Sequence, residues 1–286
     1  KTLKHKGDVW GLAVLEGGRL VSGGYDNTHL RVWDPATGVN VATMVGTGVS
    51  FAALPGGRFA AAGYDTKKAA VWDPASPARP ICEYTGHTAF VNCVASLPDN
   101  LVASGSDDKT VHIWKADTGA HVATLQGHTS WVNALAVLSD GRLASGSADK
   151  TVRLWDVSNP ASAPRVLQHG SLVNSLAALD GGILASGCGD SKVYLWDVKS
   201  ASDKPMALLE GHTNYVYSLA ALPRGLLASG SDDKTVRVWN VAARTCVAVL
   251  QGHTGYVRAL AALPDGRLAS GSHHPSDVIR VWELRP

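Results

Sequence analysis

The sequence predicts an all-β fold, a seven-bladed β-propeller with four antiparallel strands in each blade. The first observation behind this prediction is a Trp-Asp dipeptide, or a close variant of it, that recurs with 39 to 43 residues between successive tryptophans. A period near 40 residues is typical of a supersecondary unit that is copied many times. The seven copies are Trp33-Asp34, Trp72-Asp73, Trp114-Lys115, Trp155-Asp156, Trp196-Asp197, Trp239-Asn240 and Trp282-Glu283.

The second observation is the pattern within each repeat, which the fourth copy shows clearly. Its apolar runs at 132–138, 143–147 and 151–155 are rich in Val, Leu and Ala, and turn residues such as Gly, Asp and Ser bound them. Runs this short, with turn chemistry at both ends, indicate strands rather than helices. With one further outer strand, each repeat makes a four-stranded blade, whose strands we call a, b, c and d from the axis outward.

The third observation concerns the two ends of the chain. Residues 1–3 match Ala123-Thr124-Leu125, which is the predicted strand d of an internal repeat, and the chain stops just after the strand c that ends at Trp282. We therefore expect Thr2 and Leu3 to supply the fourth strand of the last blade, made by residues 257–284. Such pairing closes the ring and removes two exposed sheet edges. Residues 1–286 then form a single domain.

The Gly-His element at Gly127-His128 and the Trp155-Asp156 ending recur together at a fixed spacing, and in this combination they resemble the WD-repeat (WD40) family. The resemblance covers essentially the whole chain. It implies a closed propeller that acts as a non-enzymatic platform for binding other proteins.

Composition narrows the possible function. A formal net charge of +2 is too mild to predict binding to nucleic acid or to a membrane surface, and no apolar stretch reaches the roughly 18 residues of a membrane span. The four cysteines form no CxxC pair and fall on strand positions, so we expect buried, unpaired thiols in a reducing compartment. The predicted location is the cytoplasm, with the nucleus as an alternative. No cofactor or metal site is predicted.

Six histidines occupy one repeated position, four residues before the first valine of strand a. They are His5, His87, His128, His169, His212 and His253. The family resemblance implies that this histidine joins a buried hydrogen-bond chain with a strand-b serine, a turn aspartate and the strand-c tryptophan. In the fourth repeat these residues are His128, Ser145, Asp149 and Trp155. The other serine and aspartate pairs are Ser22/Asp26, Ser104/Asp108, Ser186/Asp190, Ser229/Asp233 and Ser270/Asp277.

These six sets contain the residue types of a hydrolase triad, but their repetition favours a structural role. A buried indole N–H is costly without an acceptor, and a hydroxyl can accept from it while donating onward. The second repeat tests this interpretation, because it lacks the histidine and has Ala61 in place of the serine, although Asp65 and Trp72 remain. We expect water or a backbone group to pair with the Trp72 indole. The second blade is either locally flexible or a docking site.

Function should come from the positions that differ between repeats. Three positions in each repeat are predicted to face the channel mouth: the two that flank the strand-a valine, which share one side of the strand, and the one before the turn aspartate. Twelve aromatic residues lie outside the strand-c tryptophans, and eight of them fall on these positions. The predicted partner-binding residues are Trp10, Tyr25, Tyr64, Phe90, Asn92, Trp131, Asn133, Asn174, Tyr215, Tyr217, Tyr256 and Arg258.

This composition is typical of a protein-binding hot spot. The predicted function is therefore a non-enzymatic scaffold, a monomeric propeller that binds an extended peptide or loop of a partner protein, with Arg258 meeting a carboxylate or phosphate. One alternative is a small-ligand or enzymatic site at the channel mouth, for which Asp8, Asp107, Asp232 and Arg258 are the only titratable candidates. Another is a regulatory or oligomerising domain of a larger protein.

Overall fold

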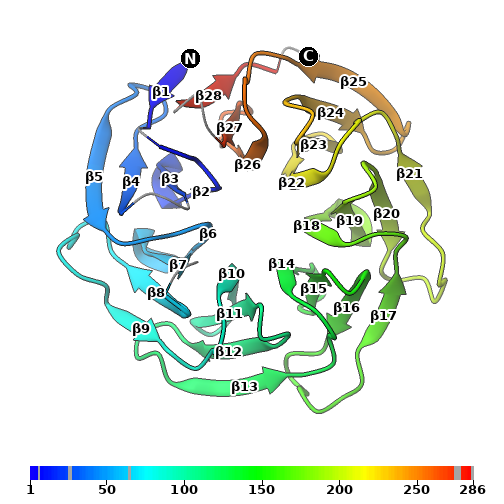
Figure 1. Cartoon of the computed structure of the whole chain (residues 1–286), viewed down its shortest axis with the longest axis horizontal. Coiled ribbons are helices and arrows are strands. Elements are labelled where there is room, and N and C mark those ends of the chain that lie inside the picture. Colours follow the sequence, from blue (N-terminus) through cyan, green and yellow to red (C-terminus); the bar gives the residue numbers. More distant parts are fainter. Residues whose placement is uncertain (6, 25–27, 64–65, 274–277, 285–286) are drawn as a thin grey trace.

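A computed structural model describes residues 1–5, 7–24, 28–63, 66–273 and 278–284. Within them, the strands form seven four-stranded antiparallel sheets, arranged as blades around a central axis (Figure 1). The predicted seven-bladed propeller is confirmed. Three short 3-10 helices, η1 (Glu16–Gly18), η2 (Pro55–Gly57) and η3 (Asp180–Gly182), lie in turns between strands a and b.

Strand a of each blade lies nearest the channel and strand d lies at the outer edge. Blade 1 contains β2 (Gly11–Val14), β3 (Leu20–Gly23), β4 (His29–Trp33) and β5 (Asn40–Val45). Blade 2 contains β6 (Ser50–Ala53), β7 (Phe59–Gly63), β8 (Lys68–Trp72) and β9 (Cys82–Tyr84). Blade 3 contains β10 (Val91–Leu97), β11 (Leu101–Ser106), β12 (Val111–Lys115) and β13 (His121–Leu125).

The same order continues around the ring. Blade 4 contains β14 (Val132–Val137), β15 (Leu143–Ser147), β16 (Thr151–Trp155) and β17 (Arg165–Gln168). Blade 5 contains β18 (Val173–Leu179), β19 (Ile183–Cys188), β20 (Val193–Asp197) and β21 (Ala207–Leu209). Blade 6 contains β22 (Val216–Leu222), β23 (Leu226–Ser231), β24 (Val236–Asn240) and β25 (Thr245–Leu250). Blade 7 contains β26 (Val257–Ala262), β27 (Leu268–Ser272), β28 (Val278–Trp282) and β1 (Thr2–Lys4).

The N-terminal strand closes the ring, as the repeat alignment predicts. Thr2 pairs with Arg280 and Lys4 with Val278 in antiparallel register, and the Leu3 side chain is 1% exposed. The backbone of Lys1 extends the ladder, because its carbonyl accepts from the Val281 N–H at 2.7 Å. The first strand, β1, and the last strand, β28, therefore lie side by side in the ring (Figure 1).

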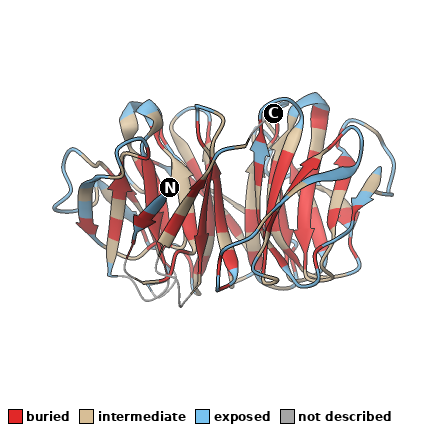
Figure 2. Ribbon diagram, turned by 90° about the horizontal axis from the view of Figure 1, so that it is seen from above, coloured by how far each residue is buried: buried red, intermediate tan, exposed pale blue. Residues whose placement is uncertain are grey.

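The core lies between adjacent blades rather than inside any one of them. The cluster that contains Leu143 and Trp155 of blade 4 also contains Ala103, Val111 and Ile113 of blade 3. Figure 2 shows the result, with buried residues concentrated in the inner strands and exposed residues at the loops and outer strands. Each blade buries apolar side chains against its neighbours, so a closed ring leaves no blade with an uncovered apolar face.

The glycine of the repeated strand-b sequence Ser-Gly-Ser allows this close packing. A Cβ atom on Gly146 would lie 2.6 Å from Cγ1 of Val173, the strand-a valine of the next blade. The same distance separates a Cβ on Gly105 from Val132. Real side chains do not tolerate contacts this short, so strand b requires glycine where strand a of the next blade crosses it.

The cysteine prediction is partly wrong. Cys93 and Cys188 are buried and all four thiols are unpaired, but Cys82 is half-buried and Cys246 is exposed. Cys246 lies on β25, the outermost strand of its blade, where no further blade covers the side chain. Among the described residues, no helix has the length and apolar character that crossing a membrane requires.

Candidate functional site

A polar relay runs from strand c to the turn between strands b and c, and blade 4 shows its full form. The Trp155 indole donates to Oγ of Ser145 at 2.8 Å, and Oγ lies 2.7 Å from Nε2 of His128. Nδ1 of His128 lies 2.7 Å from a carboxylate oxygen of Asp149. A neutral histidine with its proton on Nδ1 satisfies all four groups, because the serine then donates to Nε2 and Nδ1 donates to the carboxylate.

The same complete relay is present in blade 3, with His87, Ser104, Asp108 and Trp114, and in blade 6, with His212, Ser229, Asp233 and Trp239. Burial raises the pKa of the Asp108 and Asp233 carboxyls, but hydrogen bonds from histidine, threonine and backbone groups outweigh it, so both pKa values lie well below the usual range. These carboxylates are ionised acceptors. The serine oxygens are fully buried, so the relay joins strands b and c inside the blade and stabilises it.

Blade 5 departs from the predicted set. Trp196 and His169 both contact Oγ of Ser186, but Nδ1 of His169 lies 3.2 Å from the Leu167 carbonyl instead of Asp190. The Asp190 carboxylate accepts from the Tyr194 hydroxyl at 2.7 Å. The predicted His169–Asp190 contact is wrong because a tyrosine on strand c competes for the aspartate.

The relays of blades 1 and 7 are described only in part. Trp33 donates to Ser22 at 2.8 Å, and Trp282 donates to Ser270 at 2.7 Å. In blade 7 the serine also lies 2.6 Å from Nε2 of His253. The turn aspartates predicted for these blades, Asp26 and Asp277, and Asp65 of blade 2 lie outside the described residues.

Blade 2 lacks the inner half of the relay. Ala61 is buried at the serine position, where it pairs with Phe51 and Ala70 in the register that Ser145 has in blade 4. The Trp72 indole is 5% exposed, and no described residue accepts a hydrogen bond from it. The predicted backbone acceptor is therefore not found among these residues. A Cβ on Gly46 would lie 2.7 Å from the Trp72 ring, so the loop backbone packs directly on the indole.

Replacing the serine of a complete relay should destabilise the protein. In Ser145→Ala the indole of Trp155 and Nε2 of His128 both lose their partner while buried, and each unpaired group costs roughly 1–3 kcal/mol. We expect a loss of about 3 kcal/mol in the free energy of unfolding, measured by urea denaturation. Ser76→Ala, on an exposed loop, is the matched control. Equal stability of the two variants would contradict a bracing role for the relay.

Acid should destabilise the fold in a defined pH window. Burial lowers the pKa of His169 and His253 to about 4. Because the unfolded chain binds protons on these groups near pH 6.5, their contribution to stability is complete above about pH 6.5 and falls as the pH drops towards 4. Each histidine should lower the free energy of unfolding by about 1.4 kcal/mol per pH unit in this window. A His253→Gln variant should show a shallower pH dependence in urea denaturation, and an unchanged slope would contradict this assignment.

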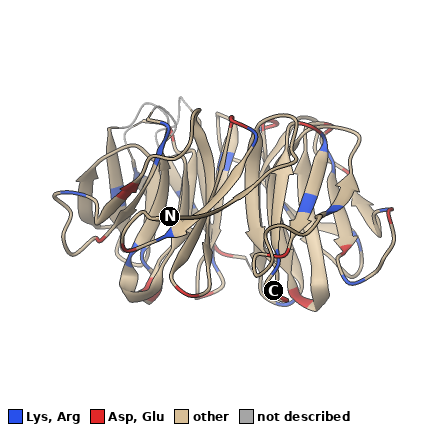
Figure 3. Cartoon of the chain, turned by 90° about the horizontal axis from the view of Figure 1, so that it is seen from below, with Lys and Arg blue, Asp and Glu red and all other residues tan. Residues whose placement is uncertain are grey.

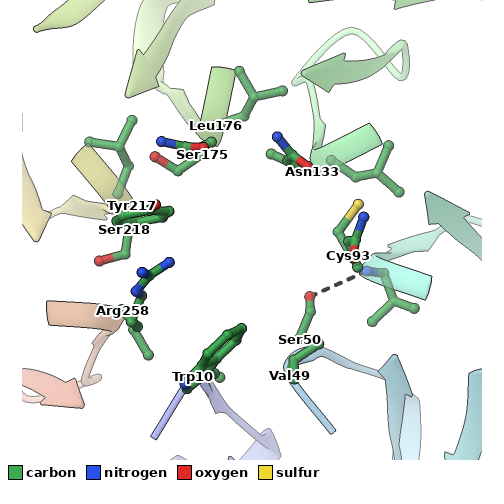
Figure 4. A pocket seen from close by; sticks show the side chains of 18 of the residues that line it. Trp10, Val49, Ser50, Cys93, Asn133, Ser175, Leu176, Tyr217, Ser218 and Arg258 are labelled. Atoms are coloured by element: carbon green, nitrogen blue, oxygen red, sulfur yellow. Dashed lines mark hydrogen bonds between the residues drawn. The ribbon is translucent and has the colours of Figure 1, made fainter. Parts of the chain in front are cut away.

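The channel mouth gathers most of the predicted binding residues. A cavity of about 740 Å³ opens here, and strand a of every blade contributes to its lining. Figure 4 shows these side chains arranged around the channel, with Trp10, Arg258 and Tyr217 along one side and Asn133 opposite. Nine of the twelve predicted residues line this cavity: Trp10, Phe90, Asn92, Trp131, Asn133, Asn174, Tyr215, Tyr217 and Arg258.

Of the other three predicted residues, the structure describes one, Tyr256. Tyr256 is 39% exposed but lies outside the cavity lining, where its ring stacks on His273 with 6.1 Å between centroids. Tyr25 and Tyr64 lie outside the described residues. Trp131 and Tyr215 are the most accessible aromatic residues of the lining, at 56% and 40% exposure.

The asparagines hold neighbouring blades together. The side-chain amide of Asn92 donates to the Val132 carbonyl at 3.2 Å, that of Asn133 to the Val173 carbonyl at 3.0 Å, and that of Asn174 to the Val216 carbonyl at 3.3 Å. Each bond joins one blade to strand a of the next. These three side chains therefore line the channel and stabilise it, which the sequence prediction did not recognise.

On the opposite side of the channel, larger side chains occupy the equivalent position. The Arg258 guanidinium lies 3.4 Å from the centre of the Tyr217 ring and 5.3 Å from that of Trp10. An Asp232 oxygen is 3.7 Å from the guanidinium, which is too long for a hydrogen bond. Burial raises the pKa of the Asp232 carboxyl, and Arg258 opposes this rise. The result is a cation between aromatic faces, with a loosely paired carboxylate beside it.

His273 belongs to this site, although the sequence analysis did not assign it there. Its Nδ1 lies 2.5 Å from an Asp8 oxygen and 3.4 Å from the Trp10 indole nitrogen. Its backbone N–H donates to the Tyr256 carbonyl, as that of Asp232 does to Tyr215. His273 thus occupies in blade 7 the position that Asp232 has in blade 6. The sequence contained this signal, since the residue lies three positions after Ser270, as Asp232 lies three after Ser229.

Seven four-stranded blades, each with a tryptophan at the end of strand c, are typical of the class of WD-repeat propellers. A family profile described as "WD domain, G-beta repeat" matches residues 1–34, 78–115, 119–156, 163–197, 203–240 and 244–283. The chain belongs to this family, whose propellers are typically scaffolds for protein interaction. The unmatched stretch 35–77 contains β6, β7 and β8 of blade 2, which lacks the serine and histidine.

Comparison with solved structures agrees with the fold. The crystal structure of the WD40 β-propeller domain of Doa1 is similar to this chain with a TM-score of 0.83. The two are 25% identical, and the similarity covers 100% of this chain and 96% of the other. A comparison with curated proteins gave no match.

Proposed function

We propose that this propeller is a non-enzymatic interaction module that binds an extended peptide or loop of a partner protein across the channel mouth. The observation that carries this proposal is the gathering of aromatic side chains from different blades around one cavity, with Trp131 and Tyr215 accessible. Burial of such rings supplies much of the energy in protein interfaces. The closed ring fixes the strands that carry these side chains, so binding costs little conformational entropy.

Charge and cysteine chemistry support the rest of the proposal. Basic and acidic side chains are interspersed along the ring rather than segregated (Figure 3), which favours a protein partner over nucleic acid. All four thiols are unpaired, which favours the cytoplasm or the nucleus. The propeller is proposed to act as a monomer, because β1 satisfies the edge of blade 7 within one chain.

One observation favours a small-ligand site as the second candidate. Two pairs of titratable side chains, Asp8 with His273 and Asp232 with Arg258, come from blades 1, 6 and 7, and Arg258 lines the cavity. The cavity volume lies in the range of small-molecule pockets.

Selection from a random peptide display library on the intact chain tests the main proposal. Selected peptides should lose binding when Trp131 and Tyr217 are both replaced by alanine. Selected peptides that bind this double variant as tightly as the unmodified protein would defeat the proposal.

A further inference from the structure

Two blade boundaries at the channel mouth share one arrangement. At both, the residue three positions after the strand-b serine of one blade contacts a residue that flanks the strand-a valine of the next blade. At the boundary of blades 6 and 7, Asp232 faces Arg258 at 3.7 Å. At the boundary of blades 7 and 1, His273 contacts both Asp8 and Trp10. We call each such meeting of side chains a corner.

At each of these two corners, a carboxylate of the chain lies beside a basic side chain of the same chain. The Asp232 carboxylate has the Arg258 guanidinium beside it, and that guanidinium also stacks on Tyr217 and lies 5.8 Å from the centre of the Tyr256 ring. The Asp8 carboxylate has the imidazole of His273. Each carboxylate at these corners therefore has a group that can carry positive charge.

The corner between blades 3 and 4 has the carboxylate and the aromatic ring but no cation. By the repeat register, Asp107 corresponds to Asp232, Trp131 to Tyr256 and Asn133 to Arg258. The Asp107 carboxylate accepts a hydrogen bond of 2.6 Å from the side-chain amide of Asn92. The same amide donates to the carbonyl of Val132, so the carboxylate lies near the backbone next to Trp131. Within the described part of the chain, no cationic side chain is within ion-pair distance of Asp107.

The Trp131 ring at this corner is open to solvent. It is 56% exposed, more than any other aromatic side chain that the structure describes, and it has no ring contact with another described residue. Asn133, which replaces the arginine found between blades 6 and 7, directs its amide to the Val173 carbonyl at 3.0 Å. The Asp107 carboxylate, which has no cationic partner, and the exposed Trp131 indole thus line the same cavity.

We propose that this corner, formed by Asp107 and Trp131, binds an arginine side chain of the partner peptide. The inference rests on the proposed peptide-binding function and specifies its chemistry. A guanidinium can pair with the carboxylate through two N–H groups while its flat face stacks on the indole. The chain's own Arg258 shows that a guanidinium suits the equivalent corner, lying beside a carboxylate and over aromatic rings.

The test uses peptides selected from a random display library on the intact chain. Each selected peptide is also synthesised with citrulline, the neutral isostere, in place of arginine. Affinities are measured for the unmodified protein, for Asp107→Asn, and for Asp180→Asn, which removes one carboxylate from the opposite face. Asp107→Asn preserves an oxygen that can accept from Asn92, and thermal unfolding checks that the variant is folded.

We expect the selected peptides to share an arginine. Citrulline should weaken binding about tenfold to the unmodified protein and to Asp180→Asn, and have little effect on Asp107→Asn, because a charge-assisted contact adds only when both partners are present. Selected peptides without a basic residue, or an equal citrulline effect in all three proteins, would overturn the arginine proposal while leaving peptide binding intact. Failure to select any peptide that depends on Trp131 and Tyr217 would instead overturn the proposed function.

Discussion

Replacing Trp131 and Tyr217 together by alanine should weaken binding of a selected peptide at least about a hundredfold, because truncating an aromatic hot-spot residue typically costs 2 kcal/mol or more. Trp131 lines the cavity from blade 4, and Tyr217 lines it from blade 6 with the Arg258 guanidinium stacked on its ring. The double change therefore removes two rings from the proposed binding surface and frees Arg258 to move. Isothermal titration calorimetry measures the loss.

The fold should survive this double change, since Trp131 is 56% exposed and Tyr217 only half-buried. We expect the melting temperature to fall by no more than about 4 °C. The matched control is the double change Val247→Ala and Val249→Ala, which removes exposed apolar surface from the outer strand β25. Loss of binding in this control, or unfolding of the Trp131/Tyr217 variant, would refute a specific role for the channel mouth.

Deleting residues 1–4 should cause the largest loss of stability. The deletion removes strand β1, exposes the edge of β28, and removes the Leu3 side chain, which is packed with Val281 and Ile279. Burial of a leucine of this kind alone contributes about 2–5 kcal/mol. Hydrogen exchange should show that the amides of β28 lose protection first, because β28 is the strand that loses its ladder partner and local opening begins where contacts are fewest.

The control for this deletion is Lys4→Ala, which changes an exposed side chain and leaves the β1–β28 ladder intact. Its exchange pattern should match that of the unmodified chain. Equal loss of protection in blades 4 and 7 of the deleted chain would mean that β1 does not specifically close the last blade.

The architecture could be predicted from sequence because the same pattern of short apolar runs and tryptophans occurs in seven repeats. The tryptophan spacing gave the number of blades, and residues 1–3 matched an internal strand d, which correctly predicted the pairing with β28. The family resemblance implied the relay of His128, Ser145, Asp149 and Trp155, and the structure contains its three hydrogen bonds. Strand alternation also placed nine predicted residues on one cavity.

Contacts between different blades could not be predicted in the same way. Asn92 reaches the Val132 carbonyl of the next blade, a partner that the pattern within one repeat does not specify. The Tyr194 hydroxyl on strand c donates a hydrogen bond to Asp190 in the turn, a contact found in no other repeat among the described residues. His273 was missed because the sequence places Asp277 seven positions after Ser270, whereas the aspartate follows the serine by four positions in the other repeats. Such pairings depend on the ring geometry, which brings residues from separate repeats together.

The most direct test of peptide binding at the channel mouth is site-specific photo-cross-linking to a selected peptide. The photoreactive residue benzoylphenylalanine would replace Trp131 in one protein and Asp265, on the opposite face, in another. We predict cross-links to the peptide from position 131 and none from position 265. Cross-linking from position 265 with none from position 131 would contradict the proposed binding face.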